Sequence, residues 1–470
     1  MLITLAAPAF AETWYIENGD ITVKASGTEG KNTVSQGNKK DVEDTNTIIT
    51  NQKTDTASSN TVTIEAGNDK VEVTLKDVNI DVSKQSKAAV SVTGSGNTTI
   101  KLDGDNHLTG GNGIYSNSRG SLTISGDEND SLTAQGGDSR NGIYSVSGDV
   151  TISGGTVNAN GGDGKDGSGG GIDSSGSVAI SGGTVTAKGG SGEDGGDGIY
   201  SSSGVAISGG AVNANGGNSD YSNGGNGIHS NGVTISGGTV KANGGNGNSG
   251  SSNGGNGIIS FDHVAISGGT VNAAGGNGGN GSISSVIDLS GSLELTAKAG
   301  SPNGKALSQA GRELELDTIK DKLGPGAKVT TTDADGKVIK QVSIPRPVEP
   351  EGPVIPEDSS SSSDGGSSAP SAPVSSIPGL TVTDKSGAVI SYTSTQSGNT
   401  LTVCVGRFTA SLRASLAALR QLRAEGIETI TFQTILCSTT LSVDELLAMG
   451  GEDAEAVLTH RSTDSSLTVG

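Results

Sequence analysis

Aromatic side chains and cysteine are scarce in this chain of 470 residues. Tryptophan, tyrosine and phenylalanine together make up 2% of it, all apolar residues make up 31%, and only two cysteines occur. A conventional thick hydrophobic core along the whole chain is therefore excluded, because too few large apolar side chains are present to fill it.

Positive charge is also in short supply. Lys and Arg number 30 against 50 Asp and Glu, which gives a formal net charge of −20. This excess of negative charge argues against nucleic acid and against anionic membrane surfaces as partners. No apolar run is long enough to span a bilayer, so no transmembrane segment is expected.

Glycine, by contrast, is abundant, with 78 residues that recur at regular intervals. Between residues 141 and 276 one phrase repeats, and the isoleucine of its middle segment returns every 27 to 31 residues, at Ile124, Ile152, Ile180, Ile207, Ile235 and Ile266. Periodic glycine of this kind favours a solenoid of structural repeats over disorder.

Each repeat carries three short segments of alternating residues, and a period of two predicts strands with one buried face. Such short strands cannot bury a face alone, so each must pair in parallel with its counterpart in the next repeat. Because parallel crossovers are right-handed in nearly all cases, the sequence predicts an all-β fold, a right-handed three-sided parallel β-helix. The predicted inward residues of one repeat are Ile143, Ser145, Val150, Ile152, Val157 and Ala159. Paired glycines such as Gly154 and Gly155 predict the corners.

Changes in composition predict six parts. They are a truncated signal peptide at 1–11, a polar and poorly ordered lead-in at 12–60, the parallel β-helix at 61–300, its C-terminal cap at 301–344, a Pro/Ser-rich linker at 345–378 and a small α/β domain at 379–470. The signal peptide rests on an apolar run that ends in a small-x-small cleavage pattern. It predicts an exported protein, secreted or held at the cell surface.

The small domain has the pattern of a βαβ unit. Leu401–Val405 is expected as a strand, Thr409–Glu425 as an amphipathic helix and Ile427–Phe432 as the returning strand. Ser442 is the expected N-cap of a second short helix. Cys404 and Cys437 could pair as a disulfide or remain two free thiols, and the sequence leaves both open.

The first strand of each repeat places one residue outward, and tyrosine recurs at that position. The candidate ligand-binding residues are Tyr115, Tyr144, Asp173, Tyr200 and His229. A column of rings on a flat face suits stacking against the apolar faces of sugar rings in an extended polymer. The alternative is that the rings stack on one another and stiffen the solenoid.

Two loops on the third side carry acidic residues at positions that match the first part of the calcium-binding β-roll repeat. The candidate metal ligands are Asp163, Asp166, Glu193, Asp194 and Asp197. Stacked oxygen ligands of this kind suit Ca²⁺, so calcium is the one cofactor expected. A solvated acidic loop without metal is the alternative reading.

A catalytic constellation is missing from the pattern. The four histidines are scattered, and Asp173 has no basic or carboxylate partner at the spacing that a lyase or an inverting glycosidase needs. A non-catalytic protein is therefore expected. An adhesin or rigid spacer remains open, as does an ice-binding role, although Ala211 and Lys241 interrupt the threonine lattice that ice binding would require.

The run from Val71 to Gly113, followed by the Ile-Ser-Gly-Gly repeats, resembles the carbohydrate-binding parallel β-helix proteins of clostridial and gut bacteria, among them a cellulosome-associated binder of polygalacturonate. The resemblance covers residues 61–300 and leaves out the C-terminal domain. It implies an exported, non-catalytic polysaccharide-binding protein, with calcium in some members. A plant cell-wall or host polysaccharide is the expected partner, and the protein is expected to be a monomer.

Overall fold

The computed structural model describes most of the chain. The described residues are 12–28, 30–165, 167–248, 253–278, 283–309, 311–346, 379–384, 388–390, 392–397, 399–405, 409–434, 438–449, 455–460 and 465–469. They form two compact units, Met1–Pro350 and Glu351–Gly470. The predicted signal peptide at 1–11 and nearly all of the predicted linker lie outside the described residues.

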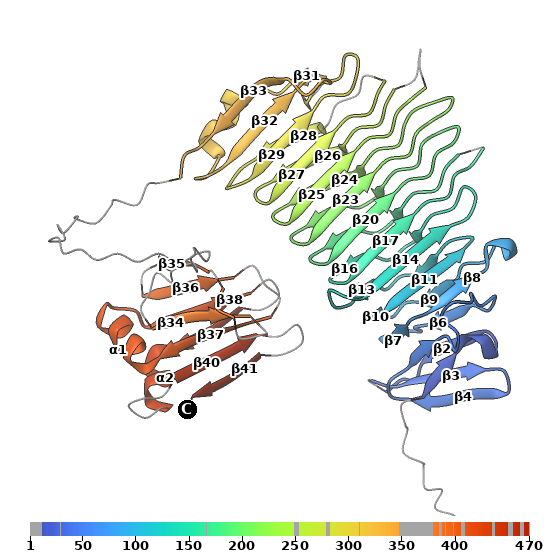
Figure 1. The fold of residues 1–470 in the computed structure, drawn as a ribbon, viewed down its shortest axis with the longest axis horizontal. Helices are drawn as coiled ribbons and strands as arrows, with labels where there is room; N and C mark the ends of the chain where they lie inside the picture. The colour runs from blue at the N-terminus through green and yellow to red at the C-terminus, as the bar shows by residue number, and fades with distance from the viewer. Residues whose placement is uncertain are drawn as a thin grey trace, which may run out of the picture. The chain divides into compact units, whose positions relative to one another are not determined.

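The first unit is a stack of turns, most of which contribute one short strand to each of three sides (Figure 1). The first side consists of β2 (Ile21–Ala25), β6 (Val62–Glu65), β9 (Val90–Gly94), β12 (Ile114–Ser118), β15 (Ile143–Ser145), β18 (Ile172–Ser174), β21 (Ile199–Ser201) and β30 (Leu307–Gln309). The second side consists of β1 (Thr13–Tyr15), β5 (Ile48–Thr50), β7 (Val71–Lys76), β10 (Thr98–Asp103), β13 (Leu122–Ser125), β16 (Val150–Ile152), β19 (Val178–Ile180) and β22 (Val205–Ile207). Three longer strands run from the first side into the second, namely β24 (Ile228–Ile235), β26 (Ile258–Ile266) and β28 (Ile283–Leu289).

The third side is a separate sheet of parallel strands. It consists of β8 (Asn79–Asp81), β11 (Asp105–Gly110), β14 (Ser131–Gly136), β17 (Thr156–Asn160), β20 (Thr184–Lys188), β23 (Ala211–Asn215), β25 (Thr239–Asn243), β27 (Thr270–Ala274), β29 (Glu294–Lys298) and β32 (Lys328–Thr332). Neighbouring turns pair in parallel on all three sides, so the predicted parallel β-helix is confirmed.

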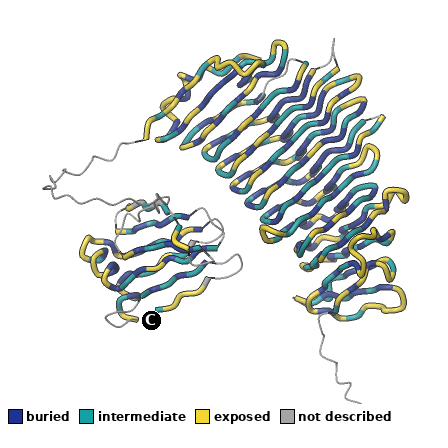
Figure 2. Tube along the Cα trace, in the orientation of Figure 1, coloured by how far each residue is buried: buried dark blue, intermediate teal, exposed yellow. Residues whose placement is uncertain are grey.

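The core is a set of aliphatic columns along the axis of the stack. Ile152 pairs in register with Ile124 in the preceding turn and with Ile180 in the following one, and all three are buried. Figure 2 shows the same alternation of buried and less buried positions along each strand. Each fully buried isoleucine contributes about 1.5–3 kcal/mol of transfer free energy, which explains why a thin core with few aromatic residues suffices.

The glycine directly before each of the third-side strands β17, β20, β23, β25 and β27 has a positive φ. Gly155, Gly183 and Gly210 have φ of 75°, 75° and 76°, in the left-handed region that side chains rarely adopt. A Cβ at Gly183 would also collide with the carbonyl oxygen of Gly155 in the turn before. The predicted corner role of the paired glycines is confirmed.

The segment 12–60 is ordered, so the prediction of a poorly ordered lead-in was wrong. β2 continues into β3 (Asn32–Gln36) and β4 (Lys39–Asp44) as an antiparallel meander, and β1 pairs in parallel with β5. Trp14 is buried and donates its Nε1–H to Oδ2 of buried Asp44 at 2.7 Å. These residues close the N-terminal end, where an uncovered apolar face would otherwise meet water. Short single-turn helices η1 (Ile16–Asn18) and η2 (Ser83–Gln85) lie in the connections.

At the C-terminal end, the regular turns give way to the segment 301–344 that was expected as a cap. β30 pairs with β31 (Arg312–Glu313), the short helix η3 spans Leu316–Lys322, and β32 forms an antiparallel hairpin with β33 (Val338–Ser343). Across the described part of the chain, no helix is both long enough and apolar enough to cross a membrane.

The second unit contains two four-stranded sheets and two helices. One sheet has the order β34 (Leu380–Thr383), β37 (Ala410–Ser415), β40 (Glu455–His460), β41 (Ser465–Val469), and the other has β35 (Thr393–Ser397), β36 (Thr400–Cys404), β38 (Thr429–Gln433), β39 (Ser438–Ser442). The helices are α1 (Leu416–Ala424) and α2 (Val443–Met449). The parallel pairing of β36 with β38 agrees with the predicted βαβ unit.

The helix predicted over Thr409–Glu425 was wrong in its first part. Ala410–Ser415 is a strand, and the helix begins only after Ser415, whose side chain accepts the backbone N–H of Ala418. The predicted cap of the second helix is present, because the backbone N–H of Glu445 donates to Oγ of Ser442 at 3.4 Å. Cys404 is described and Cys437 is not, so the pairing of the two cysteines stays a prediction.

Candidate functional site

The candidate ligand-binding residues lie in one straight row on the first side, one per turn. Tyr115 pairs with Tyr144, Tyr144 with Asp173, Asp173 with Tyr200, and Tyr200 with His229. All five side chains face outward and are half-buried. We call this row the first-side column, and its members lie about 4.8 Å apart along the stack, the spacing of paired strands.

Rings within the first-side column contact one another. The ring centroids of Tyr115 and Tyr144 lie 5.8 Å apart at an interplanar angle of 50°, and those of Tyr200 and His229 lie 5.1 Å apart at 74°. His229 also contacts Phe261, at 5.2 Å. These distances fall in the range of favourable aromatic pairs, so the rings hold each other in place and still leave part of each ring exposed.

Asp173 interrupts the rings and carries a carboxylate into the middle of the column. Its Oδ2 accepts a hydrogen bond from Nδ2 of Asn141 at 3.1 Å, and among the described residues no ion pair involves it. Burial raises the pKa of the Asp173 carboxyl to about 6, against the opposing hydrogen bond from Asn141 and with a smaller contribution from the charge of Asp197. Burial, followed by the charge of Asp173, likewise raises the pKa of Tyr144.

Asp197, a predicted metal ligand of the third-side loops, lies instead beside the first-side column and contacts His229. Its Oδ2 lies 2.8 Å from Nδ1 of His229, and its Oδ1 accepts from both the backbone N–H and the side-chain amide of Asn226, at 2.6 and 2.9 Å. The side chains of His229 and Asp197 are only 20% and 18% exposed. Asp197 therefore fixes the ring of His229 in the column.

A ladder of side-chain oxygens supports the first side from behind. The backbone N–H of Asn141 donates to Oδ1 of Asn112 at 3.0 Å, that of Gly170 to Asn141 at 2.6 Å, and that of Asn256 to Asn226 at 2.9 Å. The sequence interpretation missed this ladder. Its signal is an Asn or Asp two residues before most first-side isoleucines, as at Asn112, Asn141, Asp197, Asn226 and Asn256.

The predicted calcium ligands are divided between different structural roles. Asp163 starts a second ladder, since its Oδ1 accepts from the backbone N–H of Ser191 at 2.7 Å, and Asn218 and Asn246 continue it in later turns. Glu193 and Asp194 are exposed, and Asp166 lies outside the described residues. No group of three or more His, Cys, Asp or Glu side chains that could hold a metal occurs in the described part of the chain. Calcium therefore remains a prediction for the loops that carry Asp166, Glu193 and Asp194.

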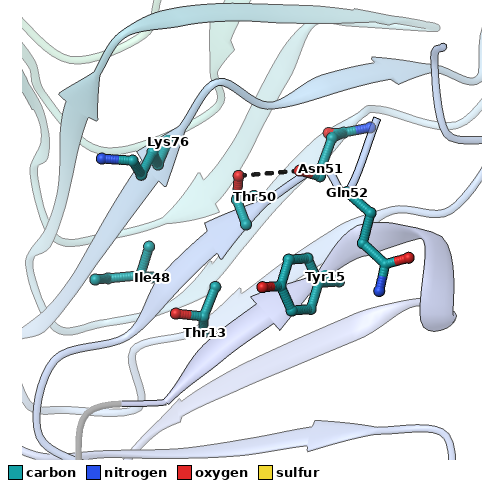
Figure 3. Close-up of a pocket in the computed structure, with 7 residues that line it drawn as sticks. All are labelled: Thr13, Tyr15, Ile48, Thr50, Asn51, Gln52 and Lys76. Carbon is teal, nitrogen blue, oxygen red and sulfur yellow. Dashed lines mark hydrogen bonds between the residues drawn. The ribbon is translucent and has the colours of Figure 1, made fainter. Parts of the chain in front are cut away.

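A hollow of about 740 Å³ lies at the N-terminal end of the second side, far along the chain from the column. Figure 3 shows its lining, which the sequence interpretation did not single out, and we call it the N-terminal hollow. It is formed mainly by Thr13, Tyr15, Ile48, Thr50, Gln52 and Lys76, with Asn51 in its wall.

Comparison with known proteins yields no relatives. No protein family, no curated protein and no solved structure matches the chain. The geometry of the chain itself therefore has to support any function assigned to it.

Proposed function

We propose that this protein is a non-catalytic polysaccharide-binding protein, secreted or exposed at the cell surface, and that the first-side column is its binding face. The observation that carries the proposal is the register of Tyr144, Asp173 and Tyr200 on three successive turns. Such a row offers ring, carboxylate and ring at regular intervals on a rigid support.

The spacing of the column fits an extended sugar chain. Tyr144 and Tyr200 are two turns apart, about 10 Å on strand spacing, which is close to the length of a disaccharide unit in an extended β-linked polymer. The rings stack on apolar sugar faces, and Asp173 accepts hydrogen bonds from sugar hydroxyl groups. Because the solenoid is rigid, little conformational entropy is lost on binding, so even a shallow face can bind.

The negative charge of the first-side column limits which polysaccharides can bind to it. Asp173 lies in the column and Asp197 beside it, and the whole chain carries a formal charge of −20. A polyanion such as polygalacturonate would be repelled unless Ca²⁺ bridged the two, so an uncharged polysaccharide is the better ligand. The same charge argues against nucleic acid, and the closed ends of the solenoid favour a monomer.

An adhesin or rigid spacer without glycan specificity is the second candidate. The contact between Tyr115 and Tyr144 favours it, because rings that satisfy one another can serve the stiffness of the stack alone. The two functions differ in what removal of the rings does. A binding face loses affinity while the fold persists, whereas a stiffening column loses stability.

A glycan array with and without Ca²⁺ tests the proposal. Binding of uncharged plant cell-wall polysaccharides that does not need Ca²⁺ supports it, and Ca²⁺-dependent binding of polygalacturonate moves the ligand to the acidic class. An array without any glycan signal favours the spacer.

A further inference from the structure

The N-terminal hollow combines side chains from three neighbouring strands of the second side. In register, Tyr15 of β1 pairs with Thr50 of β5, and Thr50 pairs with Lys76 of β7. A parallel row two residues earlier consists of Thr13 and Ile48. The regular register thus places a phenol ring, two hydroxyl groups and an aliphatic side chain side by side around one opening (Figure 3).

The polar groups at the rim are of two kinds. Asn51 is buried and fully engaged, since its Nδ2 donates to the carbonyl oxygens of Thr56 and Asn79 and its Oδ1 accepts from the N–H of Asn79. The hydroxyl of Thr50 donates to the carbonyl oxygen of Asn51 at 3.4 Å and keeps its capacity to accept (Figure 3). Among the described residues, by contrast, no hydrogen bond engages the side chains of Thr13 and Gln52. A fixed wall and unengaged donors and acceptors at the opening are the usual features of a small-molecule site.

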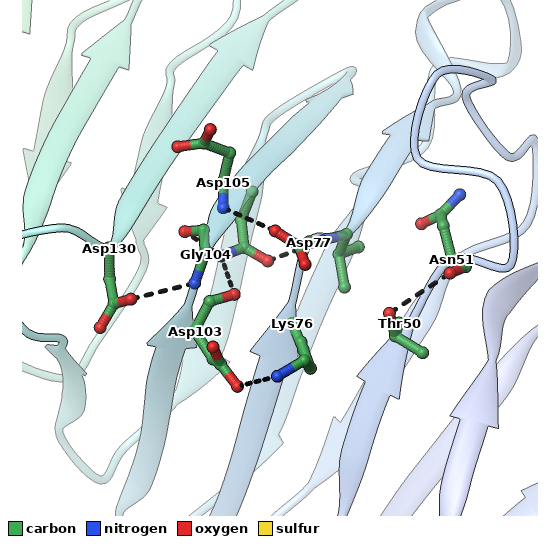
Figure 4. Close-up of polar contacts among 10 residues, drawn as sticks. Thr50, Asn51, Lys76, Asp77, Asp103, Gly104, Asp105 and Asp130 are labelled. Atoms are coloured by element: carbon green, nitrogen blue, oxygen red, sulfur yellow. Dashed lines mark hydrogen bonds and ion pairs between the residues drawn. The ribbon is translucent and has the colours of Figure 1, made fainter.

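The lining of the hollow carries no unpaired charge. Lys76 supplies the one charged side chain of the lining, and its Nζ lies 2.7 Å from Oδ2 of Asp103 (Figure 4). The surrounding carboxylates are engaged as well, since Oδ1 of Asp77 accepts from the N–H of Asp105 and Oδ1 of Asp130 from that of Gly104. An acidic ligand therefore finds no unpaired positive charge in the lining, whereas the neutral N–H donors leave the charges of Asp77 and Asp130 in place nearby.

Tyr15 is the exposed ring of this lining, with 37% of its surface accessible. The backbone of Tyr15 is held in place by its neighbour Trp14, which is buried and hydrogen-bonded to Asp44. Nζ of Lys39 also lies 5.0 Å from the centroid of the Trp14 ring. A ring held in this way loses little freedom when a ligand stacks on it.

We propose that the N-terminal hollow binds one or two units of an uncharged sugar, with a sugar ring stacked on Tyr15 and hydroxyl groups bonded to Thr13, Thr50 and Gln52. Its volume is in the range of roughly 300–1,000 Å³ of small-ligand sites. The site lies on the second side and is independent of the first-side column. It recognises a short segment or a chain end, whereas the column fits an extended chain.

The chain contains an intrinsic reporter for this site, since Trp14 is its one tryptophan. The experiment titrates the full-length protein with cellotriose, xylotriose, mannotriose and maltotriose at millimolar concentration and follows tryptophan emission, with trigalacturonate as the charged comparison. At least one neutral trisaccharide is expected to give a saturable change. Tyr15→Ala with Gln52→Ala should weaken that binding about fivefold or more, and Tyr15→Phe, which keeps the ring, should leave it within about twofold.

Controls separate this site from the column. Tyr144→Ala with Tyr200→Ala should leave the trisaccharide response of Trp14 unchanged, whatever it does to the binding of long polysaccharides. An unchanged emission maximum of the ligand-free Tyr15→Ala, Gln52→Ala variant shows that the cap remains folded. No response to any neutral trisaccharide, a response that survives that variant, or a response to trigalacturonate alone would overturn the proposal.

Discussion

Asp197 and His229, which belong to successive turns of the solenoid, lie 2.8 Å apart between Oδ2 and Nδ1. The same carboxylate accepts the backbone N–H of Asn226 through its other oxygen, at 2.6 Å. Asp197 thus connects the supporting ladder to the first-side column. Its role as acceptor in the ladder and its contact with His229 can be separated by substitution.

Asp197→Asn should preserve the ladder, because Asn112, Asn141 and Asn226 already occupy the equivalent position in other turns. Asp197→Ala removes the acceptor and leaves the partly buried N–H of Asn226 unsatisfied, which costs about 1–3 kcal/mol. Denaturant unfolding of the two variants checks this. Equal loss of stability in both would mean that the contact of the carboxylate with His229, and not the ladder, is what matters.

Stability should depend on pH through Asp173. Its pKa is raised from 3.8 to about 6 in the folded protein, so between these values the folded state binds more protons than the unfolded state. The contribution of this group to stability therefore falls as pH rises from about 4 to above 6. Melting temperatures measured across this window should decline less in Asp173→Asn than in the parent protein. An identical pH profile in the two proteins contradicts the burial of this carboxyl.

The corner glycines should tolerate no side chain. Gly183→Ala combines a positive φ of 75° with a collision against Gly155, whereas Gly311 has a φ of 74° and open space where the methyl group of an alanine would lie. Strain in the left-handed region alone costs about 1–2 kcal/mol, so Gly311→Ala should lose that much and Gly183→Ala clearly more. Equal losses in thermal unfolding would show that the corner relaxes freely.

Calcium is testable by its removal. If the loops of Asp166, Glu193 and Asp194 bind Ca²⁺, a chelator lowers the melting temperature, and Asp166→Asn with Asp194→Asn abolishes the difference. Substitution of Asp163 is the control. It should leave the effect of the chelator unchanged, because the Asp163 carboxylate already accepts the N–H of Ser191. A parent protein that melts at the same temperature with and without chelator has solvated acidic loops and no metal site.

Much of the solenoid could be predicted because the same residue type returns at the same position of each repeat. The spacing of Ile124, Ile152 and Ile180 indicated the stack, and a period of two assigned Tyr144 and Tyr200 to the outer face. The N-terminal cap could not be predicted in this way. Its strands are polar and unrepeated, and the contact that closes it joins Trp14 to Asp44 across 30 residues.

The error at Thr409–Glu425 has a similar cause. Leu412, Leu416 and Leu419 follow helical spacing, but Ala410, Leu412 and Ala414 also alternate, and pairing with β34 and β40 decides in favour of the strand. At the candidate site, the sequence predicted which residues form the column. It did not predict the bond between Asp197 and His229 or the N-terminal hollow, because both depend on side chains from separate turns.

The most direct measurement of the central claim is the affinity of Tyr144→Ala with Tyr200→Ala for the polysaccharide that the parent protein binds best. Each ring contributes around 1 kcal/mol, so the double variant should bind at least about tenfold more weakly while its circular dichroism spectrum stays unchanged. Tyr221→Ala is the matched control, because this tyrosine is 76% exposed but lies outside the column. Unchanged affinity in the double variant, or a loss equal to that of the control, would contradict the assignment of the first-side column as the binding face.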